Sequence, residues 1–202
     1  MEAMVSDASI LNATSDSADA RILLRDVAWA TYAALRDAPD HDHLRMTYLD
    51  GELEIMSPGR QHGVSAAVIG RLLEVFCLER RIPLYLLGTT TFREETQKRG
   101  LEADEAYARG IEKERPDLAI EVVVSSPLLD KLEVYRGLGV AEVWVFRRGM
   151  FTIHSLVGDR YLEVGTSVVF PEVDLPRLAH FASHADQNIA LYEYVAELRA
   201  KT

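Results

Sequence analysis

The stretch Arg115-Pro-Asp-Leu-Ala-Ile-Glu-Val-Val-Val-Ser125 decides the fold class of this chain. It is a nearly continuous apolar run after Pro116, a pattern typical of a strand buried on both faces of a sheet. Residues 130–138 follow with apolar side chains at helical spacing, and residues 140–146 form a second apolar run. Strand, helix and strand in this order predict a parallel crossover, and hence an α/β fold with the first strand central in the sheet.

Further elements are indicated on both sides of this unit. Apolar spacing predicts helices, and alternating apolar residues around tight-turn pairs such as Asp50-Gly51 predict hairpins. The expected elements are helices at 24–35, 63–81 and 189–201, hairpins at 45–57 and 151–164, a strand at 84–92 and a polar excursion at 93–100. We therefore expect a mixed sheet flanked by helices, with a helix and a hairpin added at the N-terminal side.

The length of the chain sets the expected domain organisation. Its 202 residues suffice for one substantial core, so a single domain over 21–202 is predicted. Residues 1–20 are rich in Ser, Ala, Asp, Thr and Asn without a sustained apolar period, and are expected to form a flexible segment.

Composition restricts the classes of function. With 48% hydrophobic and 27% charged residues the chain resembles an ordinary soluble protein, and no apolar stretch is long enough for a membrane helix. Together with the lone cysteine, Cys77, this predicts a cytoplasmic location without membrane association. The net charge of −10 is unusual for a protein that binds DNA. The basic residues either gather locally or scatter as solvated charges: Arg60, Arg71, Arg80, Arg81, Arg93, Lys98 and Arg99.

Three charged residues between 101 and 146 point to chemistry. This region is expected to form a β-hairpin and a helix that bring Asp104, Glu121 and Lys131 together. Glu121 lies in the middle of the apolar strand, where an unpaired charge costs several kcal/mol unless a partner such as a metal ion binds it. Asp104 precedes it by 17 residues, a separation that lets neighbouring strands present both carboxylates to a Mg²⁺ ion. Lys131, early in the following helix, can return its ammonium to the same place.

Several short motifs resemble one known family when taken in order. They are Asp50-Gly51-Glu52-Leu53, Met56-Ser57-Pro58, His62, Pro116-Asp117-Leu-Ala-Ile-Glu121-Val, Asp130-Lys131-Leu, Tyr135 and Gly139-Val140-Ala-Glu142-Val-Trp144. This pattern resembles the Uma-two family of bacterial restriction endonuclease-like proteins over roughly residues 25–180. The resemblance implies a PD-(D/E)XK core and a divalent-metal-dependent endonuclease that hydrolyses DNA phosphodiester bonds with Mg²⁺ or Mn²⁺.

The resemblance also assigns roles to individual residues. Asp104 and Glu121 are the implied metal ligands and catalytic carboxylates, and Lys131 is the catalytic lysine. Glu52 would complete the acidic cluster, or is an exposed hairpin residue. His62 would contact phosphate or donate a proton, or only makes hydrogen bonds at the start of a helix.

Two positions depart from the family pattern. Ala103 stands where the pattern has a proline, and Val123 stands where it has a lysine, a role that Lys131 is expected to take over. Asp117 is either a third metal ligand or part of the local turn after Pro116.

Other interpretations remain open at the level of sequence. The acidic net charge and Val123 favour a catalytically inactive nuclease-fold module for binding or assembly. A further alternative is a structural ion pair between Glu121 and Lys131 in an unrelated α/β protein. A homodimer is also considered, because two active sites are needed to cut two strands at once.

Overall fold

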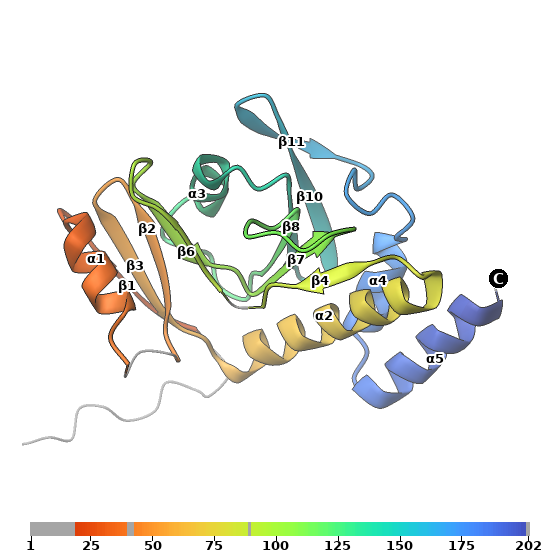
Figure 1. Ribbon diagram of the computed structural model, residues 1–202. Helices are drawn as coiled ribbons and strands as arrows, with labels where there is room; N and C mark the ends of the chain where they lie inside the picture. The colour runs from red at the N-terminus through yellow and green to blue at the C-terminus, as the bar shows by residue number, and fades with distance from the viewer. Residues whose placement is uncertain (1–18, 40–42, 89, 201–202) are drawn as a thin grey trace, which may run out of the picture.

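Two β-sheets with one helix between them form the centre of the molecule (Figure 1). The computed structural model describes residues 19–39, 43–88 and 90–200, so nearly all of the predicted flexible segment lies outside the described residues. The first sheet has the order β1 (Ala20–Leu24), β3 (Glu52–Ser57), β2 (Arg45–Leu49), β6 (Arg99–Glu102), β5 (Thr91–Glu94). The second has the order β11 (Arg160–Val164), β10 (Met150–Val157), β9 (Glu142–Arg147), β8 (Leu118–Val122), β7 (Glu105–Arg109), β4 (Leu84–Leu86).

Strand β8 is the central strand of the second sheet, as the apolar run predicts. All five of its residues are buried, and it pairs parallel with β9 and antiparallel with β7. The chain passes from β8 to β9 through α3 (Lys131–Leu138), which begins where the Asp130 side chain accepts hydrogen bonds from two backbone N–H groups. The predicted strand–helix–strand crossover and the mixed sheet are therefore confirmed.

Helices cover both faces of this sheet. On one face lie α2 (Arg60–Arg80), α4 (Leu175–Ala182) and α5 (Gln187–Ala200), which share a core with Leu118 and Ile120. On the other face, α3 packs against Ala119 and separates the second sheet from the first. Figure 1 shows α2 running beneath the sheet with α5 beside its far end. Alternate residues of β8 therefore face two different layers.

The first sheet carries the N-terminal elements. The predicted hairpin is confirmed: β2 and β3 pair antiparallel around Asp50 and Gly51, both with positive φ. Helix α1 (Trp29–Arg36) covers this sheet, where the Tyr32 and Tyr48 rings stack with centroids 4.9 Å apart.

Three boundaries differ from the prediction. The segment 24–35 contains a turn at Asp26, with φ of 55°, so the chain before it forms strand β1 and the helix begins only at Trp29. The strand expected at 84–92 divides at Gly88, with φ of 63°, into β4 and β5, which belong to different sheets. The polar excursion at 93–100 is part of a hairpin between β5 and β6.

Two further observations concern α4 and the helices as a group. Helix α4 was not expected; it begins at Leu175, directly after Asp174, whose side chain accepts a hydrogen bond from the Arg177 N–H. In the described ranges, no helix is long and apolar enough to cross a membrane.

Candidate active site

The pairing of β7 with β8 places Asp104 opposite Glu121. Glu105 is the partner of Ile120 in this antiparallel register, so the preceding residue, Asp104, lies across from Glu121 at the strand end. Directly opposed residues of antiparallel strands point to the same face. The Asp104 carboxylate also accepts a hydrogen bond of 2.8 Å from the Val122 N–H. Both carboxylates are almost fully buried, at 5% and 3% exposure.

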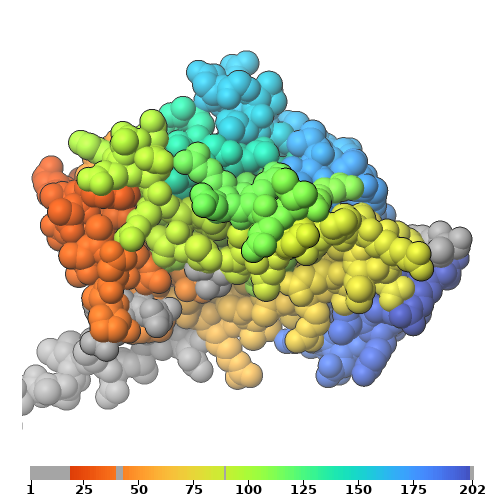
Figure 2. Space-filling view, in the orientation of Figure 1, coloured from red at the N-terminus to blue at the C-terminus, as the bar shows by residue number. Residues whose placement is uncertain are grey.

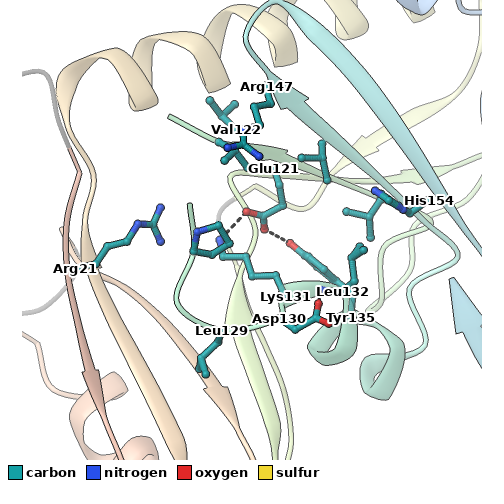
Figure 3. A pocket seen from close by; sticks show the side chains of 14 residues that line it. Arg21, Glu121, Val122, Leu129, Asp130, Lys131, Leu132, Tyr135, Arg147 and His154 are labelled. Carbon is teal, nitrogen blue, oxygen red and sulfur yellow. Dashed lines mark hydrogen bonds and ion pairs between the residues drawn. The ribbon is translucent and has the colours of Figure 1, made fainter. Parts of the chain in front are cut away.

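Helix α3 brings two hydrogen-bond donors to Glu121 (Figure 3). Lys131 Nζ lies 2.6 Å from Glu121 Oε2, and the Tyr135 hydroxyl donates to Glu121 Oε1. Lys131 and Tyr135 are four residues apart, so one helical face presents both groups to the strand. The three residues 104, 121 and 131 are thus brought together as the sequence predicts.

His62 lies on the Asp104 side of this cluster. It comes from the first turn of α2, and its Nε2 lies 2.9 Å from Asp104 Oδ2, although without the angle of a hydrogen bond. Its Nδ1 faces Asp19, with Oδ1 at 3.3 Å. The imidazole is 2% exposed. His62 therefore stands between two carboxylates from distant parts of the sequence.

Sequence reasoning missed Asp19, Arg21 and Glu54. Arg21 on β1 pairs with both carboxylates and also donates to Ser125 Oγ at 3.1 Å. Asp19 accepts hydrogen bonds from the Gly59 N–H at 3.1 Å and from Ser125 Oγ at 3.0 Å. These contacts fasten the loop after β8 to the first sheet.

Glu54 supports the same loop from another direction. Its Oε2 accepts hydrogen bonds from the backbone N–H groups of Leu128 and Leu129, at 2.6 and 3.0 Å. The only signal in the sequence is the alternation of β3, which puts Glu52 and Glu54 on one face without telling which is buried.

Glu52 is not brought to the cluster. Its side chain is 40% exposed and pairs with Arg25 at 3.1 Å, beside the turn at the start of β3. Asp117 closes the connection between β7 and β8: it accepts a hydrogen bond from the Arg109 N–H at 2.8 Å and pairs with Lys113. The structure therefore agrees with the local-turn alternative for Asp117.

The charged groups of the cluster shift one another's pKa values. Burial acts against the charged form of Lys131, but the Glu121 and Asp104 carboxylates raise its pKa overall. Burial would also raise the pKa of Asp104, yet the neighbouring His62 and Lys131 lower it. For His62, burial is outweighed by Asp104 and Asp19, so its pKa is raised. Burial raises the pKa of Glu121, and Lys131 offsets this only in part.

A pocket of about 260 Å³ opens beside Glu121 and Lys131, which we call the site pocket. Its walls are mainly apolar, and polar side chains reach it from several elements: Arg21, Asp130, Tyr135, Arg147 and His154. Figure 3 shows Arg147 on the Val122 side of this pocket and Lys131 on the other.

None of the seven basic residues considered from the sequence lines the site pocket. Arg93 pairs with Asp37, and Arg99 pairs with Asp50 and Glu133. At these positions the positive charge is neutralised by neighbouring carboxylates.

The donor set of Asp104 and Glu121 suits a hard divalent cation. Mg²⁺ is commonly held by one or two carboxylates, with water and phosphate oxygens completing its shell. Among the residues that the structure describes, no group of three or more His, Cys, Asp or Glu side chains is arranged to hold a metal ion. A cation at Glu121 Oε2 would take the place that the Lys131 ammonium holds.

Comparison with known proteins identifies the family. The family model "Uma2: Putative restriction endonuclease" matches residues 29–185, and no curated protein matches the chain. The matched range includes β2 to α4, and with them Asp104, Glu121 and Lys131. The match covers more than half of the sequence and agrees with the two sheets flanked by helices. The chain therefore belongs to the Uma2 family of restriction endonuclease-like proteins.

Proposed function

We propose that this protein is a divalent-metal-dependent endonuclease that hydrolyses DNA phosphodiester bonds. Restriction endonuclease-like proteins generally use divalent metals and act on DNA. The observation that carries the proposal is the convergence of Asp104, Glu121 and Lys131 at one end of β7 and β8. In that arrangement two carboxylates from neighbouring strands face an ammonium from the next helix.

Asp104 and Glu121 would hold the cation. When bound, Mg²⁺ or Mn²⁺ lowers the pKa of a coordinated water and withdraws charge from the phosphate. In the metal-free protein the Glu121 and Asp104 carboxylates raise the pKa of Lys131. Its ammonium, displaced from Glu121 by the cation, would stabilise the negative charge that develops on the phosphate in the transition state. This is the role expected of the lysine that Val123 replaces.

Two neighbours would assist. The Tyr135 hydroxyl donates to Glu121 Oε1 and fixes the orientation of that carboxylate. His62 is placed beside Asp104, where its imidazole holds a proton close to the cluster. Glu52 would contribute little, because its carboxylate is directed to Arg25.

One observation favours a second candidate function. Both oxygens of Glu121 already have protein partners, an arrangement that also suits a nuclease-fold module which binds or assembles without cleaving DNA. The two functions differ in the response to metal. A catalytic site exchanges the Lys131 contact for a cation, whereas a structural ion pair does not.

The test is nicking of supercoiled plasmid with Mg²⁺ or Mn²⁺. We expect the wild type to nick, and Glu121→Gln to lose at least about 100-fold in rate, the scale of a lost group that stabilises transition-state charge. Glu163→Gln, an exposed carboxylate on β11, serves as the matched control and should nick like the wild type. Absence of nicking by the wild type, or equal rates for wild type and Glu121→Gln, contradicts the proposal.

Calorimetry with Mn²⁺ separates the two candidate functions. Binding that disappears in Asp104→Ala supports the metal site, and no binding by the wild type supports the structural alternative. The cytoplasmic location and the homodimer remain predictions. Sedimentation of the chain with and without DNA tests the homodimer.

A further inference from the structure

A second, larger hollow adjoins the candidate active site. It measures about 560 Å³ and lies between the first turns of α2, the end of β8, the turn from β9 to β10 and the loop from α4 to α5. Its polar lining residues are Gln61, Ser65, Arg148, Ser183, His184 and Gln187. We call this hollow the α2–α4 groove.

The lining of the α2–α4 groove lacks the excess of acidic residues that characterises the chain as a whole. The sequence holds 32 Asp and Glu against 22 Lys and Arg, yet none of the described residues that line the groove is acidic. Arg148 is basic, and apart from His184 the other polar residues are amides and hydroxyls that donate hydrogen bonds. Asp186, in the same loop as His184, is turned to the helix, where it caps the first N–H groups of α5.

The groove and the site pocket open on the two faces of the second sheet and meet at the end of β8. Val122 and Val123, at the end of β8, line both. Arg147 lines the site pocket and the next residue, Arg148, lines the groove. On α2, Gln61 of the groove directly precedes His62. A DNA backbone that passes Glu121 would reach the groove by crossing the end of β8.

We propose that the α2–α4 groove binds the DNA backbone on one side of the phosphate that is cleaved, with Arg148 contacting a phosphate. The inference rests on the proposed function and adds the path of the substrate. A surface without carboxylates is the part of an acidic protein where a polyanion meets the least repulsion. Amide and hydroxyl donors are regular phosphate ligands beside arginine.

The test measures binding alone, so it does not depend on cleavage. Wild type, Arg148→Gln and Arg160→Gln are titrated into a short fluorescent DNA duplex with Ca²⁺ in place of Mg²⁺, over a range of salt. Arg160 is a matched control, because it is also an exposed arginine next to a hairpin turn, at the other end of β10. Figure 2 shows the hairpin of β10 and β11 projecting from the molecular surface.

A phosphate contact has a defined signature in salt. Loss of one contact makes the negative slope of the logarithm of the association constant against the logarithm of the salt concentration shallower by about 0.9. Over a fourfold change in salt, the ratio of wild-type to Arg148→Gln affinity should therefore change by about 3.5-fold. Arg160→Gln should keep the wild-type slope. Ser65→Glu, which places a negative charge in the groove, should weaken binding in a variant that keeps Arg148.

Several results overturn the inference. They are an unchanged slope for Arg148→Gln, or an equal loss of slope for Arg160→Gln. A change in the oligomeric state of Arg148→Gln without a change in DNA affinity assigns the groove to a second copy of the chain instead. Thermal unfolding confirms that each variant is folded. If the wild type does not nick plasmid but Arg148→Gln shows the predicted change in salt slope, the proposed cleavage is contradicted and the groove remains the DNA path.

Discussion

Replacement of Lys131 by Met should separate the electrostatic role of this residue from its packing. Lys131 Nζ lies 2.6 Å from Glu121 Oε2, and the two side chains are 12% and 4% exposed. Methionine keeps most of the apolar stem and removes the charge. The variant therefore leaves two buried carboxylates, Glu121 and Asp104, without their nearest ammonium.

The size of the effect follows from burial. Removing one partner of a buried ion pair typically costs about 3–5 kcal/mol of unfolding free energy, because the other charge stays buried without compensation. With a slope of about 3 kcal/mol per M for urea, this shifts the unfolding midpoint by about 1 to 2 M. Lys113→Met is the matched control. The Lys113 side chain is 37% exposed and pairs with Asp117 at the surface, so its loss should cost less than about 1 kcal/mol.

The loss of stability caused by Lys131→Met should depend on pH. Burial raises the pKa of Glu121 and Lys131 acts in the opposite direction, so Lys131→Met raises this pKa further. The folded variant then holds a proton on Glu121 more tightly than the unfolded chain does. Its stability must rise as the pH falls through this folded-state pKa toward the unfolded value of 4.5. The difference from the wild type should therefore be smaller at about pH 5.5 than at about pH 8.

Metal provides the second readout of the same variant. In Lys131→Met a cation no longer competes with the ammonium for Glu121 Oε2, so Mn²⁺ should bind at least as tightly as to the wild type and should restore stability. Nicking should be lost even so. Urea unfolding at two pH values, with and without Mn²⁺, measures all of this. A loss below about 1 kcal/mol, or one that is the same at both pH values, refutes the reasoning.

Two further substitutions probe the surroundings of the site. Tyr135→Phe removes the donor to Glu121 Oε1 and should lower the free energy of unfolding by about 1–3 kcal/mol. Tyr85→Phe, at the surface, is the control and should leave the melting temperature unchanged. Equal melting temperatures for the two variants would contradict a structural role of this hydrogen bond. Glu52→Ala should keep plasmid nicking within about twofold of the wild type, because its carboxylate binds Arg25 at the surface, and a large loss would return Glu52 to the catalytic group.

The strongest patterns in the sequence predicted the centre of the fold. The apolar run of β8 and the helical spacing of α3 are local signals, so the crossover to β9 followed from them. Strand β1 was missed because its last residue, Leu24, was interpreted as the start of the helix expected at 24–35, and only pairing with β3 makes the segment extended. Local propensity cannot report a partner strand whose paired residues lie 29 to 37 residues away.

The candidate site likewise contains residues that local sequence patterns predicted and residues that only distant contacts bring into place. The convergence of Asp104, Glu121 and Lys131 could be predicted, because the charge of Glu121 in an apolar strand is visible in the sequence and its two partners followed from their spacing and the family resemblance. Asp19 could not, since it is buried by contacts with Gly59 and Ser125, 40 and 106 residues further on. Local sequence patterns do not predict contacts between such distant residues.

The hydrogen bond between Asp19 and Ser125 also has a consequence for the order of folding. It spans 106 residues, and the two ends belong to the first sheet and to the loop after β8. A chain still emerging from the ribosome cannot close this loop until β8 has been made, and contacts across so long a separation form late. The corner that holds His62 and Asp104 is therefore completed only after the chain as far as the loop that follows β8 has been made. A nuclease built in this way would have no complete site on nascent chains that end before this loop.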